Sequence, residues 1–286
     1  MEPSVSEIAE KFNALDLALC RATLYSALAL GFRPPTEAAI ARLVQPENAA
    51  ALADAAAILE THPHPYERAR ESTLASEERT RVRRDLGLVA TVKILSRAGQ
   101  IGVAALASSY RALFGHTARG PIPPYETEYG NEALFQQPQE LGDLMGFYRA
   151  FGLTVRITEH ERPDHVSCQC EFLSFLALKE AYALEHQETA MLEETRKATR
   201  LFLRDHLGRF LPAFVRKLRT ADPGGFYGTL GDFCLKFVTH ECDRLAVPIG
   251  LEGVGLRPAA DDHVPMACGS GSECVTMAGA FNPEQE

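Results

Sequence analysis

Strand-like patterns are almost absent from this sequence of 286 residues. Only residues 153–158 alternate between apolar and polar side chains, as a half-buried strand does. No run approaches the roughly 20 apolar residues that a membrane-spanning helix needs, which argues against membrane insertion. Residues 4–12 lack the basic region and the apolar core of a secretory signal. These absences predict a helical, cytoplasmic protein whose seven cysteines are reduced thiols.

Motifs of common enzyme classes and an excess of basic residues are also missing. The sequence contains no G-x-x-x-x-G-K-[ST] loop for nucleotide phosphates and no G-x-S-x-G elbow for a nucleophilic serine. Its 29 Lys and Arg residues face 38 Asp and Glu residues, a formal net charge of −9. Since a general nucleic-acid binder needs a basic face, this balance argues against nucleic acid as a partner. It suits a cationic partner, such as an arginine-containing peptide.

Helical periodicity fills most of the chain. Apolar residues recur at three- and four-residue spacing, and Gly or Pro residues separate the periodic stretches. The expected helices cover about residues 6–30, 37–44 with Thr36 as N-cap, 47–60, 79–95, 100–114, 140–151, 164–186, 188–207, 210–220 and 227–245. We therefore predict an all-α fold: one globular helical bundle of about ten helices over residues 1–247.

The last 39 residues, 248–286, have a different composition. From residue 246 onward the chain carries six acidic residues against one basic residue, together with six Gly and four Pro. This composition predicts a flexible acidic tail. Cys268 and Cys274 flank a Gly-rich stretch there, and with His263 they could hold a metal ion, although three ligands leave a structural zinc site one short. We therefore favour incidental cysteines and expect no metal or other cofactor.

Two breaks in the helical pattern carry chemically distinctive residues. The first is Pro121-Ile122-Pro123-Pro124-Tyr125-Glu126-Thr127-Glu128-Tyr129-Gly130, where prolines stiffen the backbone beside aromatic and acidic side chains. The second is Glu161-Arg162-Pro163-Asp164-His165, directly before a long apolar run. Taken singly, the first is a loop packed on the core, and Asp164 is a helix cap.

An enzymatic alternative rests on the second break. His160, Glu161 and His165 resemble the zinc-binding helix of a metallohydrolase at a glance. The two histidines are five residues apart rather than four, and Pro163 interrupts the turn, so they would not share a helix face. Cys168 and Cys170 lie close to His165 in sequence, but 170 points about 200° away from 168 on a helix. We therefore favour a binding protein over an enzyme, with a generic helical interaction scaffold as the nearer alternative.

Taken together, the two breaks resemble the TorD/DmsD/NarJ family of redox-enzyme maturation chaperones. Besides the Pro-Pro-Tyr-Glu loop and the Glu-Arg-Pro-Asp-His segment, further motifs match the family in order and spacing. They are 110–114 (Tyr-Arg-Ala-Leu-Phe), 147–153 (Phe-Tyr-Arg-Ala-Phe-Gly-Leu), 171–176 (Glu-Phe-Leu-Ser-Phe-Leu) and 202–207 (Phe-Leu-Arg-Asp-His-Leu) with Pro212 and Phe214. The chain departs from the pattern in having no tryptophan; Tyr125 and Phe210 stand where relatives often place one.

The resemblance implies an all-α chaperone without catalytic residues. It implies a partner, namely the catalytic subunit of a molybdenum-cofactor enzyme, bound through its twin-arginine leader or N-terminal segment until cofactor insertion and export. By motif match, the peptide-binding residues are Pro124, Tyr125, Glu126, Tyr129, Asp164 and His165. We therefore expect residues 124–129 and 164–165 to face one another across one cleft. The sequence leaves open whether the chaperone is a monomer or a dimer.

Overall fold

The computed structural model describes residues 13–62, 87–115, 120–130, 137–154 and 162–257. Within these ranges the regular structure is helical, with isolated bridges but no strand, so the all-α prediction is confirmed. The α-helices are α2 (Ala14–Gly31), α3 (Glu37–Val44), α4 (Pro46–Thr61), α7 (Leu88–Ile101), α8 (Val103–Phe114), α9 (Gln137–Ala150), α10 (Val166–Glu185), α11 (Thr189–Phe202), α12 (Gly208–Ala221) and α13 (Phe226–Arg244).

Local signals explain several helix ends. Asn13 caps α2 and forms a capping box with Asp16, and the Thr36 hydroxyl accepts a hydrogen bond from the Ala39 N–H, as predicted for the start of α3. Gly102, with a φ of 83°, separates α7 from α8, and the two helices meet at 117°. Leu153 and Thr154, from the short alternating stretch, have no regular structure, and its other residues lie outside the described ranges.

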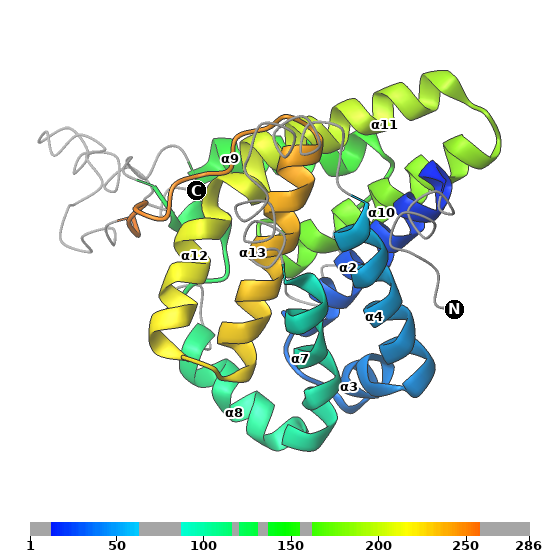
Figure 1. Cartoon of the computed structure of the whole chain (residues 1–286). Helices are drawn as coiled ribbons and strands as arrows, with labels where there is room; N and C mark the ends of the chain where they lie inside the picture. Colours follow the sequence, from blue (N-terminus) through cyan, green and yellow to red (C-terminus); the bar gives the residue numbers. More distant parts are fainter. Residues whose placement is uncertain (1–12, 63–86, 116–119, 131–136, 155–161, 258–286) are drawn as a thin grey trace, which may run out of the picture.

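Helices α2 and α10 lie side by side through the centre of the bundle, with α4 beside α2 and α13 beside α12 (Figure 1). By length and composition alone α2 could cross a membrane, as could the bent pair α7 and α8. The sequence analysis expected no segment to approach that length, so α2 differs from this expectation. Half of α2 is buried inside the protein. Its buried side chains, among them Leu24, Tyr25 and Leu28, belong to the core, where the rings of Tyr25 and Phe237 lie 4.6 Å apart.

A buried ion-pair network joins α2, α10, α11 and α13. Arg21 on α2 contacts Glu180 on α10 at 2.9 Å and Glu241 on α13 at 3.7 Å. Arg196 on α11 and Arg244 on α13 complete it, at 2.8 Å from Glu180 and 2.9 Å from Glu241. Burial alone would raise the pKa of both glutamates, but the surrounding arginines outweigh it and hold each pKa below its usual range.

The boundary between α11 and α12 differs from the prediction. Gly208 was expected to close a helix, but the chain continues through a π-helical turn, η3 (Leu203–Leu207), directly into α12. Gly208 keeps a helical conformation, and a Cβ there would lie 2.4 Å from the Leu203 carbonyl oxygen. Pro212 has no N–H to donate to the Gly208 carbonyl, which accepts instead from the Gly250 N–H at 2.9 Å.

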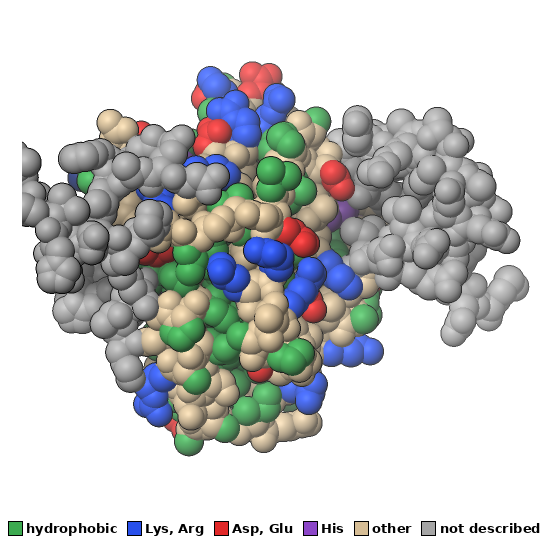
Figure 2. Space-filling model, turned by 90° about the vertical axis from the view of Figure 1, so that its left-hand side faces the viewer, with side chains coloured by type: hydrophobic (Ala, Val, Ile, Leu, Met, Phe, Trp, Pro, Cys, Tyr) green, Lys and Arg blue, Asp and Glu red, His purple; other side chains and the backbone are tan. Residues whose placement is uncertain are grey.

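Helix α12 is strongly amphipathic. Phe210, Phe214 and Leu218 are buried, whereas Arg209, Arg216 and Arg219 are exposed. Figure 2 looks onto the side of the molecule on which α12 lies, and shows Lys and Arg side chains spread over its centre. The acidic excess of the whole chain is therefore not uniform over its surface.

Candidate functional site

The two sequence breaks meet in the structure. Tyr125 and His165 form an isolated antiparallel bridge. On either side of it, the Glu126 N–H donates to the Asp164 carbonyl at 3.0 Å and the Val166 N–H donates to the Pro124 carbonyl at 2.9 Å. We call residues 124–129 and 162–165 the loop–helix junction. The predicted proximity is confirmed, but the segments are in direct contact rather than on opposite walls of a cleft.

Asp164 holds the junction together. Its carboxylate accepts hydrogen bonds from the Thr127 N–H at 3.2 Å, the Thr127 hydroxyl at 2.8 Å and the Arg162 guanidinium at 2.8 and 3.0 Å. Asp164 was expected as the cap or first residue of a helix, but the helix starts at Val166 and its N-cap is His165. The carboxylate is therefore occupied by another segment of the chain, which no local helix signal reveals.

Arg162 lies over the outer side of the junction. Its guanidinium contacts Glu128 at 3.0 Å, donates to the Thr127 hydroxyl at 2.5 Å and lies 4.4 Å from the centre of the Tyr125 ring. Burial alone would lower the pKa of Arg162, but Asp164 and Glu128 outweigh it and raise that pKa above its usual value. Arg162 was not among the residues predicted for the site, although it lies inside the Glu-Arg-Pro-Asp-His motif.

His165 is buried and neutral. Burial, with smaller contributions from Arg33 and Arg162, lowers its pKa to about 3. Its Nδ1 accepts a hydrogen bond from the Ser167 N–H at 3.1 Å, which caps α10. Its ring packs edge-on against Tyr125, with the ring centres 5.2 Å apart. The side chain therefore connects the helix start to the loop, and it carries no charge near neutral pH.

Tyr129 and Pro124 are also turned inward. Both are buried, and the Tyr129 hydroxyl donates to the Pro123 carbonyl at 2.9 Å. Residues 255–257, within the segment that the sequence assigns to the tail, run along the same loop: the Arg257 N–H donates to the Glu128 carbonyl and Tyr129 forms a bridge with Leu256. The proline-rich loop is thus covered on one side by the end of the described chain.

Glu126 points from the junction towards a neighbouring groove. Its carboxylate is fully buried and accepts hydrogen bonds from Gln169 at 2.7 Å and Arg209 at 2.9 Å, with His206 Nδ1 at 3.2 Å. Burial alone would lower the pKa of Arg209, but Glu126 and Glu140 raise it above its usual value. Glu126 is the one residue of the six predicted for the peptide site that lines this groove.

The groove has a volume of about 700 Å³ and lies between α9 and the α11–α12 connection. We call it the α9 groove. It is lined by Glu126, Glu140, Gly142, Asp143, Gly146, Phe147, Ala150, Arg204, Asp205, His206 and Arg209. Four carboxylates face two arginines, and Phe147 and Ala150 add apolar surface. Apart from Glu126, these residues were not predicted as site residues, because they come from two further segments, 140–150 and 204–209, that only the fold brings together.

Metal binding finds no support in the described part of the chain. No group of three or more His, Cys, Asp or Glu side chains there is placed to hold a metal ion. His165 serves as the helix cap, and Cys170 is fully buried. The other residues considered for a metal, His160, Glu161, His263, Cys268 and Cys274, lie outside the described ranges.

Comparison with known proteins finds a family that resembles the central part of the chain. Residues 79–216 match the family described as nitrate reductase delta subunit. This range holds both sequence breaks, the loop–helix junction and the described walls of the α9 groove. Over this range the chain is similar to nitrate reductase delta subunits and TorD-like maturation chaperones. The resemblance noted from the sequence motifs is thereby confirmed.

The named relatives with detectable similarity are chaperones. The chain is 30% identical to the chaperone protein TorD of Vibrio cholerae serotype O1 (strain ATCC 39315 / El Tor Inaba N16961) over 138 residues, 48% of this chain and 60% of that protein. It is 38% identical over 82 residues to the selenate reductase assembly chaperone protein of Thauera selenatis, 29% of this chain and 42% of that protein. A chlorate reductase assembly chaperone protein from Ideonella dechloratans shares 37% identity over 95 residues, 33% of this chain and 45% of that protein.

These matches span about half the length of the relatives. Their names describe chaperones and not enzymes, in agreement with the non-enzymatic class predicted from the sequence.

Proposed function

We propose that this protein is an assembly chaperone for a molybdenum-cofactor oxidoreductase. It binds the twin-arginine leader or N-terminal segment of the catalytic subunit in the cytoplasm and holds that subunit until cofactor insertion, assembly and export. Similarity to the maturation-chaperone family carries this proposal, since similar proteins are named as assembly chaperones of selenate, perchlorate and chlorate reductases.

The α9 groove is the peptide-binding surface in this proposal. Gly142 and Gly146 lie one helical turn apart on α9, and a Cβ at either position would meet no atom within 4 Å. A glycine inside a helix costs about 1 kcal/mol relative to alanine, and packing in the monomer does not require it at these positions. The glycine pair therefore leaves this face of α9 without side chains at two positions, which makes room for the backbone of a bound peptide.

The chemistry of the groove suits a leader with arginines beside apolar residues. Asp143 is exposed at the groove, and Glu140 and Asp205 add carboxylates that already bind guanidinium groups of this chain. Carboxylates recognise arginine through paired hydrogen bonds, which a bound leader can form in the same way. Phe147 offers an apolar wall beside them.

The six residues predicted from sequence then divide into two roles. Glu126 faces the groove and orders Arg209, and Tyr125 is partly exposed at the junction. Pro124, Tyr129, Asp164 and His165 are buried, and in this proposal they hold the loop so that Glu126 keeps its position. They are positioning residues for the peptide site rather than direct contacts.

The test is a titration of fluorescently labelled leader peptides from the molybdoenzymes of the same genome, followed by anisotropy. At least one leader should bind more tightly than its scrambled control. Gly146→Leu, which places a side chain in the groove, should weaken binding at least tenfold, whereas the matched Gly146→Ala variant should bind almost normally. Neither variant should lower the melting temperature, because a Cβ at this position meets no neighbouring atom.

Two results would count against separate parts of the proposal. If no leader exceeds its scrambled control, the leader-binding function fails. If leaders bind and Gly146→Leu leaves their affinity unchanged, the chaperone function stands and the α9 groove is not the site.

A further inference from the structure

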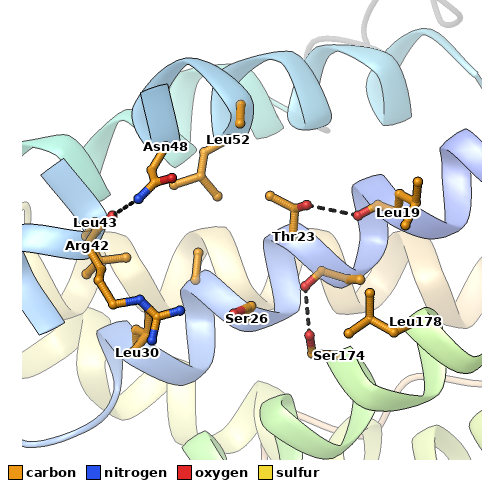
Figure 3. Close-up of a pocket in the computed structure, with 13 residues that line it drawn as sticks. Leu19, Thr23, Ser26, Leu30, Arg42, Leu43, Asn48, Leu52, Ser174 and Leu178 are labelled. Atoms are coloured by element: carbon orange, nitrogen blue, oxygen red, sulfur yellow. Dashed lines mark hydrogen bonds between the residues drawn. The ribbon is translucent and has the colours of Figure 1, made fainter. Parts of the chain in front are cut away.

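A second groove lies on a different set of helices. Figure 3 shows it between α2, α4 and the side of α10, with a volume of about 320 Å³. We call it the α2–α4 groove. Small residues, among them Ala22, Ser26 and Ala51, line it beside the larger Leu30, Leu43 and Leu52. Small side chains on adjacent helices let another chain approach the backbone closely.

Exposed apolar side chains gather beside this groove. Leu19 on α2 and Leu178 on α10 line it and are 44% and 51% exposed. Tyr182, one turn beyond Leu178, is 48% exposed. Among the described residues only five large apolar side chains are exposed, and Leu19, Leu178 and Tyr182 are three of them that lie close together. Such a cluster beside a groove marks an interaction surface.

The two ends of the groove carry opposite charges. At one end, Arg42 reaches from α3 towards Leu30 (Figure 3). At the other end, beyond Leu19, lie Asp16 on α2 and Asp54 on α4. Both carboxylates are near enough to Cys20 to raise the pKa of its thiol, an effect that adds to the larger one of burial. The surface therefore has a cation at one end, an apolar middle and carboxylates at the other end.

We propose that the α2–α4 groove is the interface of a symmetric dimer, with a second copy of this chain as its occupant. A two-fold axis through the middle of the groove reverses its direction in the partner. The cationic end of each copy then meets the acidic end of the other, and the exposed Leu178 side of each faces the hollow of the other. Surfaces that complement themselves in this way are what a two-fold dimer requires.

This inference is independent of the leader-binding proposal. The α9 groove is lined by α9 and the α11–α12 connection, and shares no lining residue with the α2–α4 groove. Dimerisation through the latter leaves both leader sites accessible, one in each copy.

The test is sedimentation velocity of the full chain over a concentration series from about 1 to about 100 μM, the range in which a modest interface dissociates. The wild-type protein should shift from monomer to dimer. Leu178→Glu places a charge in the apolar middle of both halves of the interface and should weaken the dimer at least tenfold. Leu251→Glu is the matched control, since Leu251 is 75% exposed and lies away from the groove, and it should dimerise normally.

A charge reversal distinguishes this dimer from any other. Arg42→Glu and Asp54→Arg should each weaken the dimer about threefold to tenfold, because each places like charges together at both ends of the interface. The double variant, Arg42→Glu with Asp54→Arg, restores opposite charges across the interface and should recover much of the affinity. Neither residue is buried, so all variants should keep the wild-type melting temperature.

Three outcomes would overturn the inference. They are a monomer at every concentration, a dimer that Leu178→Glu leaves intact, and a double variant weaker than both single variants. A monomer whose groove instead binds an apolar peptide, detected as a loss of that binding in Leu178→Glu, would also replace the second copy as occupant.

Discussion

The hydroxyl of Thr127 donates a hydrogen bond of 2.8 Å to the carboxylate of Asp164, which lies 37 positions later in the chain. Both residues are fully buried, and the same carboxylate binds the Arg162 guanidinium. This contact fixes the proline-rich loop to the start of α10. The main role of Asp164 is therefore structural.

Asp164→Asn should therefore lower the free energy of unfolding by about 1–3 kcal/mol, the cost of weakening a buried, charge-assisted network. Urea denaturation at constant pH measures the change. The matched control is Asp143→Asn, at an exposed carboxylate of the α9 groove. It should leave stability unchanged and, under the proposed function, weaken leader binding; an equal loss of stability in both variants would contradict this division of roles.

His165 should make stability depend on pH below about 6.5. Because its pKa is about 3 in the folded protein and 6.5 otherwise, the unfolded chain takes up a proton first as the pH falls. Stability from this residue is complete above pH 6.5 and decreases by up to about 1.4 kcal/mol per pH unit on the way to pH 3. His165→Asn keeps a good N-cap residue without the titration. Unfolding free energies at about pH 7.5 and about pH 5 should differ less in this variant than in the wild type, and equal differences would exclude His165 as the cause.

The buried network around Arg21 should be sensitive to the loss of its central cation. Arg21→Met leaves Glu180 and Glu241 with fewer partners inside the protein and should cost about 3–5 kcal/mol. Lys197→Met provides the comparison, since Lys197 is 66% exposed and 3.8 Å from Glu194, and its loss should scarcely change the melting temperature. Thermal unfolding of both variants tests the contrast; similar melting temperatures would show that the network adds little.

Gly208→Ala should destabilise the α11–α12 connection. A Cβ at this position would meet the Leu203 carbonyl oxygen at 2.4 Å and the Cys242 sulfur at 3.2 Å, so the π-helical turn would have to shift. We expect a loss of about 1–3 kcal/mol. Gly142→Ala, on the open side of α9, should be neutral or stabilise by up to about 1 kcal/mol through helix propensity. A tolerated Gly208→Ala would mean that the turn relaxes freely.

Much of the fold was predictable from local pattern. The Thr36 cap, the end of α2 at Gly31, the end of α8 before Gly115 and the break at Gly152 depend on residues within a few positions of one another, so periodicity and capping rules locate them. The η3 turn was not predictable, since the close contacts that require glycine at position 208 come from packing and from a neighbouring helix.

The candidate site likewise combines features that were predictable from local sequence with features that depend on tertiary packing. The sequence by itself determined an all-α chain, the two breaks and the resemblance of their motifs to the maturation-chaperone family. Only the tertiary structure decided which polar groups remain available. It pairs Asp164 with Thr127 and Arg162, turns Tyr129 and His165 inward, and directs Glu126 to Arg209 beside the α9 groove. The physical reason is that burial and pairing depend on contacts such as Arg162 with Thr127 and Arg209 with Glu126, 35 and 83 positions apart, for which a single sequence contains no periodic signal.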